Sequence, residues 1–468
     1  MKQLYLTIGL IFFVSLLAAQ TVGEKLATAI KNMQADTAFK HASMSLYVVE
    51  TNSNKVVFDY NSQLGLAPAS CQKIITSVTA FELLGNNYKY KTELSYDGTI
   101  NNGVLKGNLY IVGSGDPTLG SWRYLTTNDS LVLANWLMAI KKVGIKNIKG
   151  NVFFDGTKLA YQPLPGGWIW DDIGNYYGAG SWGLNWHENQ YDLVLQPGNN
   201  EGDDVYILET KPALQKAYLK PLLTTGKKGS GDNGYIYLPP NSTTGFVTGT
   251  VPAGEKLFTI AGAMPNPTWQ IEKALEDKLL PEKIGFKNMI DVSMPDNTKA
   301  IAKPILLLQT HLSPSLDSIN YWFLKKSINL YGEALLKTIA YEKTGIGSTE
   351  KGIDIVKKFW LEKGISKGAI YIIDGSGLSP QNRITTDVLV KVLQYAKDKT
   401  WFNSFYKALP LYNNMTLKSG TIGGTKSFAG YHTSKAGVNY TVAFIVNNFD
   451  GAASNVVKKM FTVLDQLK

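Results

Sequence analysis

The stretch Pro68-Ala69-Ser70-Cys71-Gln72-Lys73 decides how this chain is interpreted, because it places a serine three positions before a lysine. Residues at that spacing lie on one side of a helix, so the lysine amine can reach the serine hydroxyl. Apolar residues recur on one side of the segment that follows, before Gly85; they are Ile74, Ile75, Val78, Phe81 and Leu84. The pattern predicts a helix with Ser70 in its first turn, where an unpaired backbone N–H can bind a developing oxyanion.

An S-x-x-K pair alone is a weak signal, because ordinary helix starts also combine a serine with an exposed lysine. Two distant segments change this interpretation: Ser327-Ile328-Asn329 and Lys418-Ser419-Gly420-Thr421. An S-x-x-K, an S-x-N and a K-[ST]-G in this order are the signature of penicillin-binding proteins and active-serine β-lactamases. The three motifs together predict an enzyme with a nucleophilic serine.

The S-x-N motif has a competing copy at Ser318-Ile319-Asn320. A helical pattern returns over residues 312–342, and this copy fits it as an ordinary turn of helix. Ser327 instead follows two lysines and precedes Glu333, so we favour it. Cys71 is a rival nucleophile next to Ser70, but a neighbouring helix position points elsewhere and most free cysteines are buried packing residues.

The ordered motifs resemble those of the D-alanyl-D-alanine carboxypeptidase/endopeptidase family, the class C low-molecular-mass penicillin-binding proteins of the penicillin-binding protein 4 type. The resemblance extends over essentially the whole mature chain, and a long insert separates the first two motifs as it does in that family. Four further stretches carry it: Gly-Ser-Gly-Asp-Pro-Thr-Leu at 113–119, Pro-Gly-Gly-Trp-Ile-Trp-Asp-Asp at 165–172, Tyr-Tyr-Gly-Ala at 176–179 and Asp-Gly-Ser-Gly-Leu-Ser at 374–379. Ile328 departs from the pattern, because Asp or Asn is common there.

The resemblance implies a fold and a division of the chain. It implies an α/β (α+β) fold with a transpeptidase-like, serine β-lactamase-like domain, in which helices flank a five-stranded antiparallel sheet. Residues 21–95 and 300–468 would form this catalytic domain, and residues 96–299 would form one or two β-rich inserted domains.

The resemblance also implies roles for the motif residues. Ser70 would attack the D-Ala-D-Ala amide and form an acyl-enzyme, with Lys73 as the base if burial and nearby positive charge keep it neutral. Ser327 would pass a proton to the departing D-alanine, Lys418 would polarise that relay, and Asn329 would hold the substrate amide. The residues that would receive the terminal carboxylate beside Lys418 are Ser419, Gly420 and Thr421, and the backbone N–H groups of Ser70 and Thr421 would form the oxyanion hole.

A loop of the expected insert offers a second binding element. Asp171 and Asp172 stand beside Trp168 and Trp170, and a carboxylate next to an aromatic wall suits a ligand ammonium. A stem peptide with a free amino group at its third residue supplies such an ammonium. The alternative is that the two tryptophans only anchor the insert on the catalytic domain.

Composition and the N-terminal segment indicate an exported protein. The 468 residues suggest two or three domains. The apolar run over residues 4–17 is too short to span a bilayer and predicts a signal peptide over residues 1–20, so the mature protein would be secreted or periplasmic without a stable membrane anchor. The net charge of +10 suits an anionic cell-wall polymer, whereas no dense basic run favours nucleic acid.

The remaining motifs predict neither a metal nor a cofactor. The histidines at 41, 187, 311 and 432 lack metal-site spacing, and Gly375-Ser376-Gly377 is not a nucleophile elbow because the glycines do not fit the G-x-S-x-G register. We therefore expect a serine D-Ala-D-Ala carboxypeptidase/endopeptidase that acts on peptidoglycan stem peptides and is acylated by β-lactams. A non-catalytic cell-wall-binding relative is the main alternative, and a β-lactamase is the other. The balance of the two peptidase activities and the oligomeric state stay open.

Overall fold

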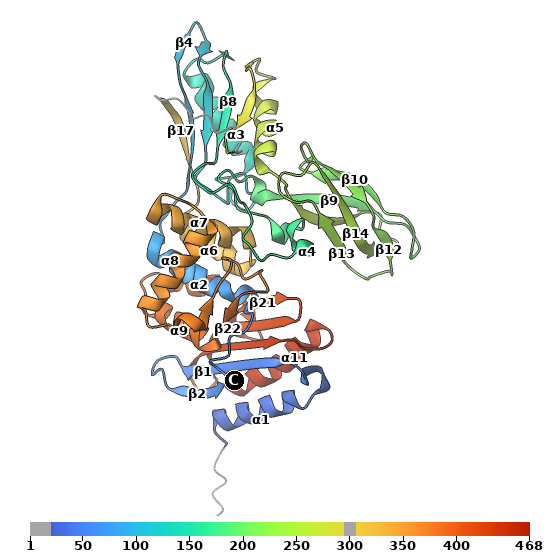
Figure 1. Cartoon of the computed structure of the whole chain (residues 1–468), viewed down its shortest axis with the longest axis vertical. Helices are drawn as coiled ribbons and strands as arrows, with labels where there is room; N and C mark the ends of the chain where they lie inside the picture. The colour runs from blue at the N-terminus through green and yellow to red at the C-terminus, as the bar shows by residue number, and fades with distance from the viewer. Residues whose placement is uncertain (1–19, 294–305) are drawn as a thin grey trace, which may run out of the picture.

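The computed structural model describes residues 20–293 and 306–468, so the signal peptide expected over residues 1–20 lies, apart from Gln20, outside the described residues. An antiparallel six-stranded sheet lies at the base of the view in Figure 1, in the order β2-β1-β23-β22-β21-β20. Its strands are β1 (Ser43–Glu50), β2 (Val56–Tyr60), β20 (Leu411–Tyr412), β21 (Met415–Ile422), β22 (Thr425–Thr433) and β23 (Asn439–Asn447). The expected number was five, and the additional strand is the two-residue β20 at the sheet edge.

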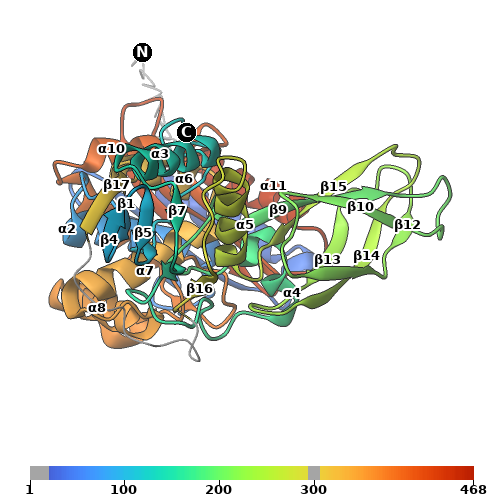
Figure 2. The same ribbon diagram turned by 90° about the horizontal axis from the view of Figure 1, so that it is seen from above.

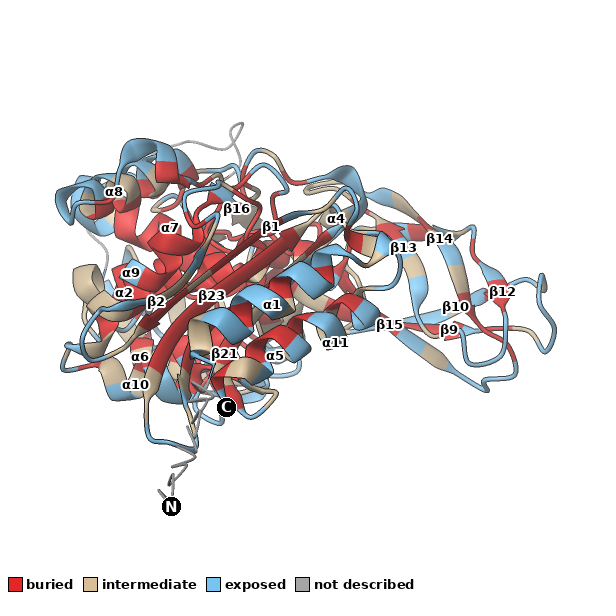
Figure 3. Ribbon diagram, turned by 90° about the horizontal axis from the view of Figure 1, so that it is seen from below, coloured by how far each residue is buried: buried red, intermediate tan, exposed pale blue. Residues whose placement is uncertain are grey.

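Helices cover both faces of this sheet. On one face lie α1 (Val22–Gln34) and α11 (Ala453–Leu464), whose apolar sides meet the strands while their polar sides face solvent (Figure 3). Thr21 begins α1 with a capping box to Glu24. The helices gathered beyond the other face are α2 (Lys73–Leu84), α6 (Leu316–Lys325), α7 (Asn329–Thr344), α8 (Thr349–Glu362), α9 (Thr386–Lys397) and α10 (Phe402–Ala408).

Helix α2 is the central helix of the larger core. The sequence predicted one apolar side, yet every residue from Lys73 to Phe81 is buried, because α6, α7 and α9 all pack against it. Gly85 ends the helix as expected, with φ 84°. The catalytic motif therefore begins a helix that is enclosed by protein.

The helical pattern over residues 312–342 forms two helices. A break after Lys325 separates α6 from α7, and Ser327 lies in it with a left-handed φ of 59°. The break places Ser327 and Asn329 at the N-terminal end of α7, whereas the competing Ser318-Ile319-Asn320 stays within α6.

A second, mixed sheet lies above these helices in Figure 1, in the order β16-β8-β6-β3-β17. Its strands are β3 (Lys91–Tyr96), β6 (Leu109–Val112), β8 (Val152–Asp155), β16 (Met289–Asp291) and β17 (Leu306–Leu312). Helices α3 (Asp129–Lys142) and α5 (Pro267–Leu279) contribute to its core, and β4 (Thr99–Asn101), β5 (Val104–Lys106) and β7 (Asn147–Ile148) form a small sheet nearby. Because β3 pairs with β17, this sheet reaches beyond the expected insert boundaries at 96 and 299.

A β-rich lobe extends sideways from the body in Figures 1 and 2. One sheet has the order β10-β9-β15, and β14 of the other pairs with β11, β12 and β13. The strands are β9 (Gln190–Gln196), β10 (Tyr206–Lys211), β11 (Tyr218–Pro221), β12 (Thr224–Gly226), β13 (Asn233–Tyr237), β14 (Thr244–Pro252) and β15 (Phe258–Ala263). Among the residues that the structure describes, no helix has the length and apolar character needed to cross a membrane.

Candidate active site

Ser70 lies in a tight 3-10 turn, η2 (Ala69–Gln72), directly before α2. Ala69 adopts a left-handed φ of 46°, an unusual conformation that the packing around the turn must stabilise. Two glycines allow other segments to approach the turn closely. A Cβ on Gly377 would lie 2.0 Å from the Ala69 oxygen, and one on Gly420 would lie 2.7 Å from the Ser70 nitrogen. The backbones around Ser70 therefore pack without room for a methyl group at either position.

Lys73 is fully buried, and its amine makes three short contacts. Nζ lies 3.0 Å from Ser70 Oγ, 2.6 Å from Asn329 Oδ1 and 2.7 Å from the Ser376 carbonyl oxygen. Burial lowers the pKa of Lys73 well below its ordinary value, and the nearby charge of Lys418 lowers it further. The serine and lysine of the first motif thus meet as expected, with the amine next to the hydroxyl and its ammonium form disfavoured.

Asn329 links this lysine to the loop expected to belong to the insert. Its Oδ1 accepts from Lys73 Nζ, and its Nδ2 donates to the Tyr177 carbonyl oxygen at 2.7 Å. Tyr177 lies in the short turn η3 (Tyr176–Gly178). Because both ends of the Asn329 amide are held, its oxygen is fixed toward the lysine.

The third motif lies on β21. Lys418 is buried and its Nζ donates to the Ser419 carbonyl oxygen at 2.6 Å, while burial lowers the pKa of Lys418 to about 8. Thr421 Oγ1 accepts from Lys426 Nζ at 2.7 Å. Cys71 is buried and its thiol contacts the Lys418 carbonyl oxygen at 3.2 Å, which agrees with a packing role.

A cavity of about 610 Å³ opens at these motifs. Ser70, Ser327, Asn329 and Thr421 from the three motifs line it. Across from them, the residues that line it from the segments between β8 and β14 are Asp171, Asp172, Tyr176, Tyr177, Gln190 and Tyr235. The cavity therefore brings together residues from distant parts of the chain. Within the described ranges, no three His, Cys, Asp or Glu side chains lie close enough to hold a metal ion.

The two aspartates differ in their surroundings. Asp171 lies in the short helix α4 (Trp170–Ile173), is exposed, and accepts from the Tyr237 hydroxyl at 2.8 Å. Burial and, to a smaller extent, the neighbouring charge of Asp171 raise the pKa of Asp172 to about 6. Both residues line the cavity.

The two tryptophans of this loop also differ from each other. Trp168 is buried and its Nε1 donates to Asp374 Oδ2 at 2.9 Å, so it connects the loop to the catalytic region. Trp170 is 49% exposed and its ring lies 5.6 Å from that of Tyr237. The anchoring alternative thus describes Trp168, whereas Trp170 packs within its own lobe.

The competing S-x-N copy lies away from the reacting groups. Ser318 Oγ lies 3.4 Å from Ser315 Oγ, and the buried Asn320 accepts from the Ser77 hydroxyl at 2.6 Å. This copy makes packing contacts between α6 and α2.

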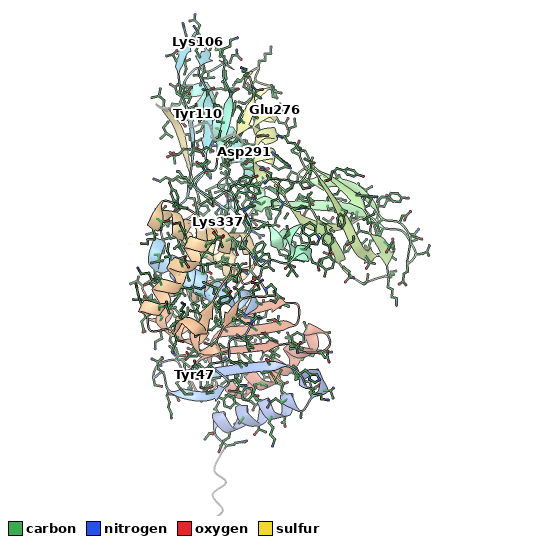
Figure 4. All side chains as sticks on the ribbon, viewed as in Figure 1. Tyr47, Lys106, Tyr110, Glu276, Asp291 and Lys337 are labelled. Carbon is green, nitrogen blue, oxygen red and sulfur yellow. The ribbon has the colours of Figure 1, made fainter. Side chains whose placement is uncertain are left out.

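The sequence did not single out several buried polar groups that support the site. Asp374 accepts hydrogen bonds from five donors, namely Gln72 Nε2, Trp168 Nε1, Asn382 Nδ2 and the backbone N–H groups of Gly377 and Ser379. Lys337 lies on α7 and is labelled in Figure 4. Its amine donates to the carbonyl oxygens of Gln162 at 2.6 Å and Ser181 at 2.8 Å. The available signal was the stretch at 374–379, which is one of the four stretches that carry the family resemblance.

Comparison of the sequence with known protein families identifies the family of this chain. The sequence profile of the D-Ala-D-Ala carboxypeptidase 3 (S13) family matches residues 26–467. The chain belongs to this family. It is accordingly a serine-type peptidase, and the predicted resemblance is confirmed.

Two relatives of this S13 peptidase have similar lengths. The chain is 26% identical over 442 residues to a D-alanyl-D-alanine carboxypeptidase from Actinomadura sp., covering 88% of this chain and 79% of that protein. It is 26% identical over 424 residues to the D-alanyl-D-alanine carboxypeptidase DacB of Haemophilus influenzae, covering 85% and 84%.

The fold is also that of a solved structure. Penicillin-binding protein 4 from Haemophilus influenzae superimposes with a TM-score of 0.79 at 21% identity, over 94% of this chain and 99% of that one. A second structure of that protein, in complex with a β-lactam, gives a TM-score of 0.73 over 94% and 98%. This similarity confirms the predicted fold class.

Proposed function

We propose that this S13 peptidase is a penicillin-binding serine D-Ala-D-Ala carboxypeptidase/endopeptidase that acts on peptidoglycan stem peptides. The observation that carries the proposal is the contact of 3.0 Å between Ser70 Oγ and the buried amine of Lys73 at the cavity. The names of the Actinomadura and Haemophilus relatives support the activity, and the β-lactam complex of the Haemophilus protein supports the inhibitor class.

The first half of the proposed reaction acylates the enzyme. Ser70 Oγ attacks the carbonyl carbon of the penultimate D-alanine, and its proton passes to the neutral Lys73 amine. The backbone N–H groups of Ser70 and Thr421 stabilise the oxyanion. The C–N bond then breaks, and the proton taken up by Lys73 is relayed through the Ser327 hydroxyl to the nitrogen of the departing D-alanine, with Lys418 as the neighbouring positive charge.

The second half restores the enzyme. A water molecule attacks the acyl-serine ester, the shortened peptide leaves with a new carboxylate, and Ser70 regains its proton. A β-lactam follows the first half only, because its amide opens on Ser70 and the resulting ester hydrolyses slowly. The proposed steps use no cofactor.

Substrate contacts divide between the two sides of the cavity. Lys418 with Ser419, Gly420 and Thr421 receives the terminal carboxylate, and Asn329 orients a substrate amide. Asp171 and Asp172 bind an ammonium on the side chain of the third stem residue through opposite charge. Their position on the cavity wall supports this assignment.

We further propose how the chain is organised and where it works. Residues 21–95 and 300–468 form the catalytic domain, and residues 96–299 form the insert, whose mixed sheet also takes in β3 and β17 from the flanking segments. The signal peptide over residues 1–20 is removed, and the enzyme acts in the periplasm on peptidoglycan.

The experiment uses purified mature protein and a synthetic stem pentapeptide that ends in D-Ala-D-Ala. Wild type should release free D-alanine, and Ser70→Ala should release none while keeping the wild-type circular dichroism spectrum. A cross-linked muropeptide dimer tests the endopeptidase activity in the same way. Release that persists in Ser70→Ala would overturn the assignment of the nucleophile.

A further inference from the structure

Glu333 is a fully buried carboxyl one helical turn after Asn329 on α7. Its two oxygens lie 3.1 and 3.0 Å from the backbone N–H of Gly375, which donates to them. Helix α7 and the loop at 374–379 approach each other closely at Gly332 and Gly375. A Cβ on Gly375 would lie 2.3 Å from the Gly332 oxygen. The close approach brings the carboxyl directly against the loop.

The held loop is the one that contacts the catalytic lysine. The residue after Gly375 is Ser376, whose carbonyl oxygen accepts from Lys73 Nζ at 2.7 Å and whose hydroxyl donates to the Glu333 carboxyl. The Glu333 side chain therefore binds the Gly375–Ser376 segment. Ser376 of this segment supplies one of the three contacts of the Lys73 amine. Helix α7 holds the lysine twice, directly through Asn329 and through this loop.

We propose that Glu333 is a positioning residue for Lys73, which fixes the Gly375–Ser376 segment against the amine and influences whether that amine is charged. This inference rests on the proposed roles of Ser70 and Lys73. Glu333 does not reach the reacting atoms itself, and it acts through Ser376 and through its charge.

The charges around Glu333 support the second part of this role. Asp374 faces it from the loop, Lys73 from α2, and Lys337 from the next turn of α7. Burial and, to a smaller extent, the charge of Asp374 raise the pKa of Glu333 to about 8, so near neutral pH the carboxyl keeps its proton. If Glu333 ionised, its negative charge would stabilise the ammonium form of Lys73 and remove the base.

The test is the pH dependence of penicillin acylation in Glu333→Gln, Glu333→Ala and the control Thr338→Val. Thr338 is buried on the same helix and contacts the Tyr90 hydroxyl at 3.0 Å. Its variant therefore measures the effect of losing an uncharged hydrogen-bonding group from the same core. Each rate is measured from pH 5 to 9 with a fluorescent penicillin, and urea unfolding gives the stability of each variant.

Glu333→Gln keeps an acceptor for Gly375 but cannot ionise. Up to about pH 7.5, where the wild-type carboxyl keeps its proton, its rate should stay within about 3-fold of wild type. From about pH 8 to 9 its rate should exceed that of wild type, because only the wild-type carboxyl ionises there and favours the lysine ammonium. Glu333→Ala lacks the acceptor, and its plateau should fall at least about 10-fold, the effect of roughly one lost hydrogen bond.

Two results would overturn the inference. One is a Glu333→Gln rate that departs more than about 3-fold from wild type below about pH 7.5, or that does not exceed wild type from about pH 8 to 9. The other is a folded Glu333→Ala with the plateau rate of Thr338→Val. If Glu333→Ala does not fold, the Gln profile alone decides. A wild-type protein that is not acylated at Ser70 would instead refute the proposed function, which separates the two failures.

Discussion

The two S-I-N copies allow the catalytic assignment to be tested with matched substitutions in the same chain. Ser327 and Asn329 line the cavity at the start of α7, whereas Ser318 and Asn320 lie within α6. Identical changes at the two copies should therefore have different consequences. We expect the later copy to control acylation and turnover, and the earlier copy to influence only stability.

The contacts of Asn329 set the expected size of the effect. Asn329→Ala removes the oxygen that lies 2.6 Å from Lys73 Nζ and the donor to the Tyr177 carbonyl oxygen. A hydrogen bond between uncharged groups contributes about 0.5–1.5 kcal/mol, so loss of the bond to the neutral Lys73 amine corresponds to a fall in acylation rate of about 2- to 13-fold. Ser327→Ala removes the proposed proton donor and should lower peptidase turnover at least ~10²-fold.

Asn320→Ala provides the matched control. Its Oδ1 accepts from the buried Ser77 hydroxyl at 2.6 Å, and that hydroxyl loses this acceptor in the variant. The free energy of unfolding should fall by about 1–3 kcal/mol, while acylation of the folded protein stays close to wild type. Ser318→Ala should change both quantities little, since its hydroxyl makes only long contacts, at 3.4 Å with Ser315 Oγ and at 3.5 Å with Asp317 Oδ1.

The assay measures penicillin acylation by stopped-flow, D-alanine release from a pentapeptide, and urea unfolding for all four variants. The reasoning fails if Asn320→Ala or Ser318→Ala lowers the rates more than its counterpart in the later copy does. It also fails if Asn329→Ala acylates at the wild-type rate, because Lys73 would then not depend on that amide.

Three other changes test separate parts of the account. Lys73→Ala should keep penicillin binding but lower acylation by roughly 10³-fold or more, as expected for a lost general base, and near-normal acylation would refute that assignment. Asp171→Asn or Asp172→Asn should lower kcat/KM for a peptide with a free amino group and spare both a blocked analogue and penicillin acylation, whereas equal losses on all three would indicate a structural role. Because the pKa of Glu333 is raised from 4.5 to about 8, the folded protein holds a proton that the unfolded chain has lost between these values. The unfolding free energy of wild type relative to Glu333→Gln should therefore fall as pH rises from 5 to 7.5, and a flat difference would contradict the raised pKa.

The sequence predicted those features that depend on local pattern. The Ser70–Lys73 spacing and the order of the three motifs are visible in short stretches, and the structure brings the motifs to one cavity. The apolar recurrence after Lys73 and the glycine at position 85 were sufficient to predict α2 and its end.

The supporting groups depend on contacts between distant segments, which no local pattern encodes. Glu333 follows the S-x-N motif at a helical spacing, but only the approach of the loop at 374–379 gives its carboxyl a partner. Trp168 could not be assigned to Asp374 because some two hundred positions separate them in sequence. The additional strand β20 escaped detection because two residues are too few for a period to appear.

The position of the penicillin adduct tests the central claim most directly. Purified protein is incubated with a β-lactam, digested, and examined by mass spectrometry, and the release of the adduct is followed over time. We predict a single adduct on Ser70 that persists for many times the acylation half-time. An adduct on another residue, or a folded protein that takes up no label, would contradict the proposed chemistry, and rapid loss of the Ser70 adduct would indicate a β-lactamase.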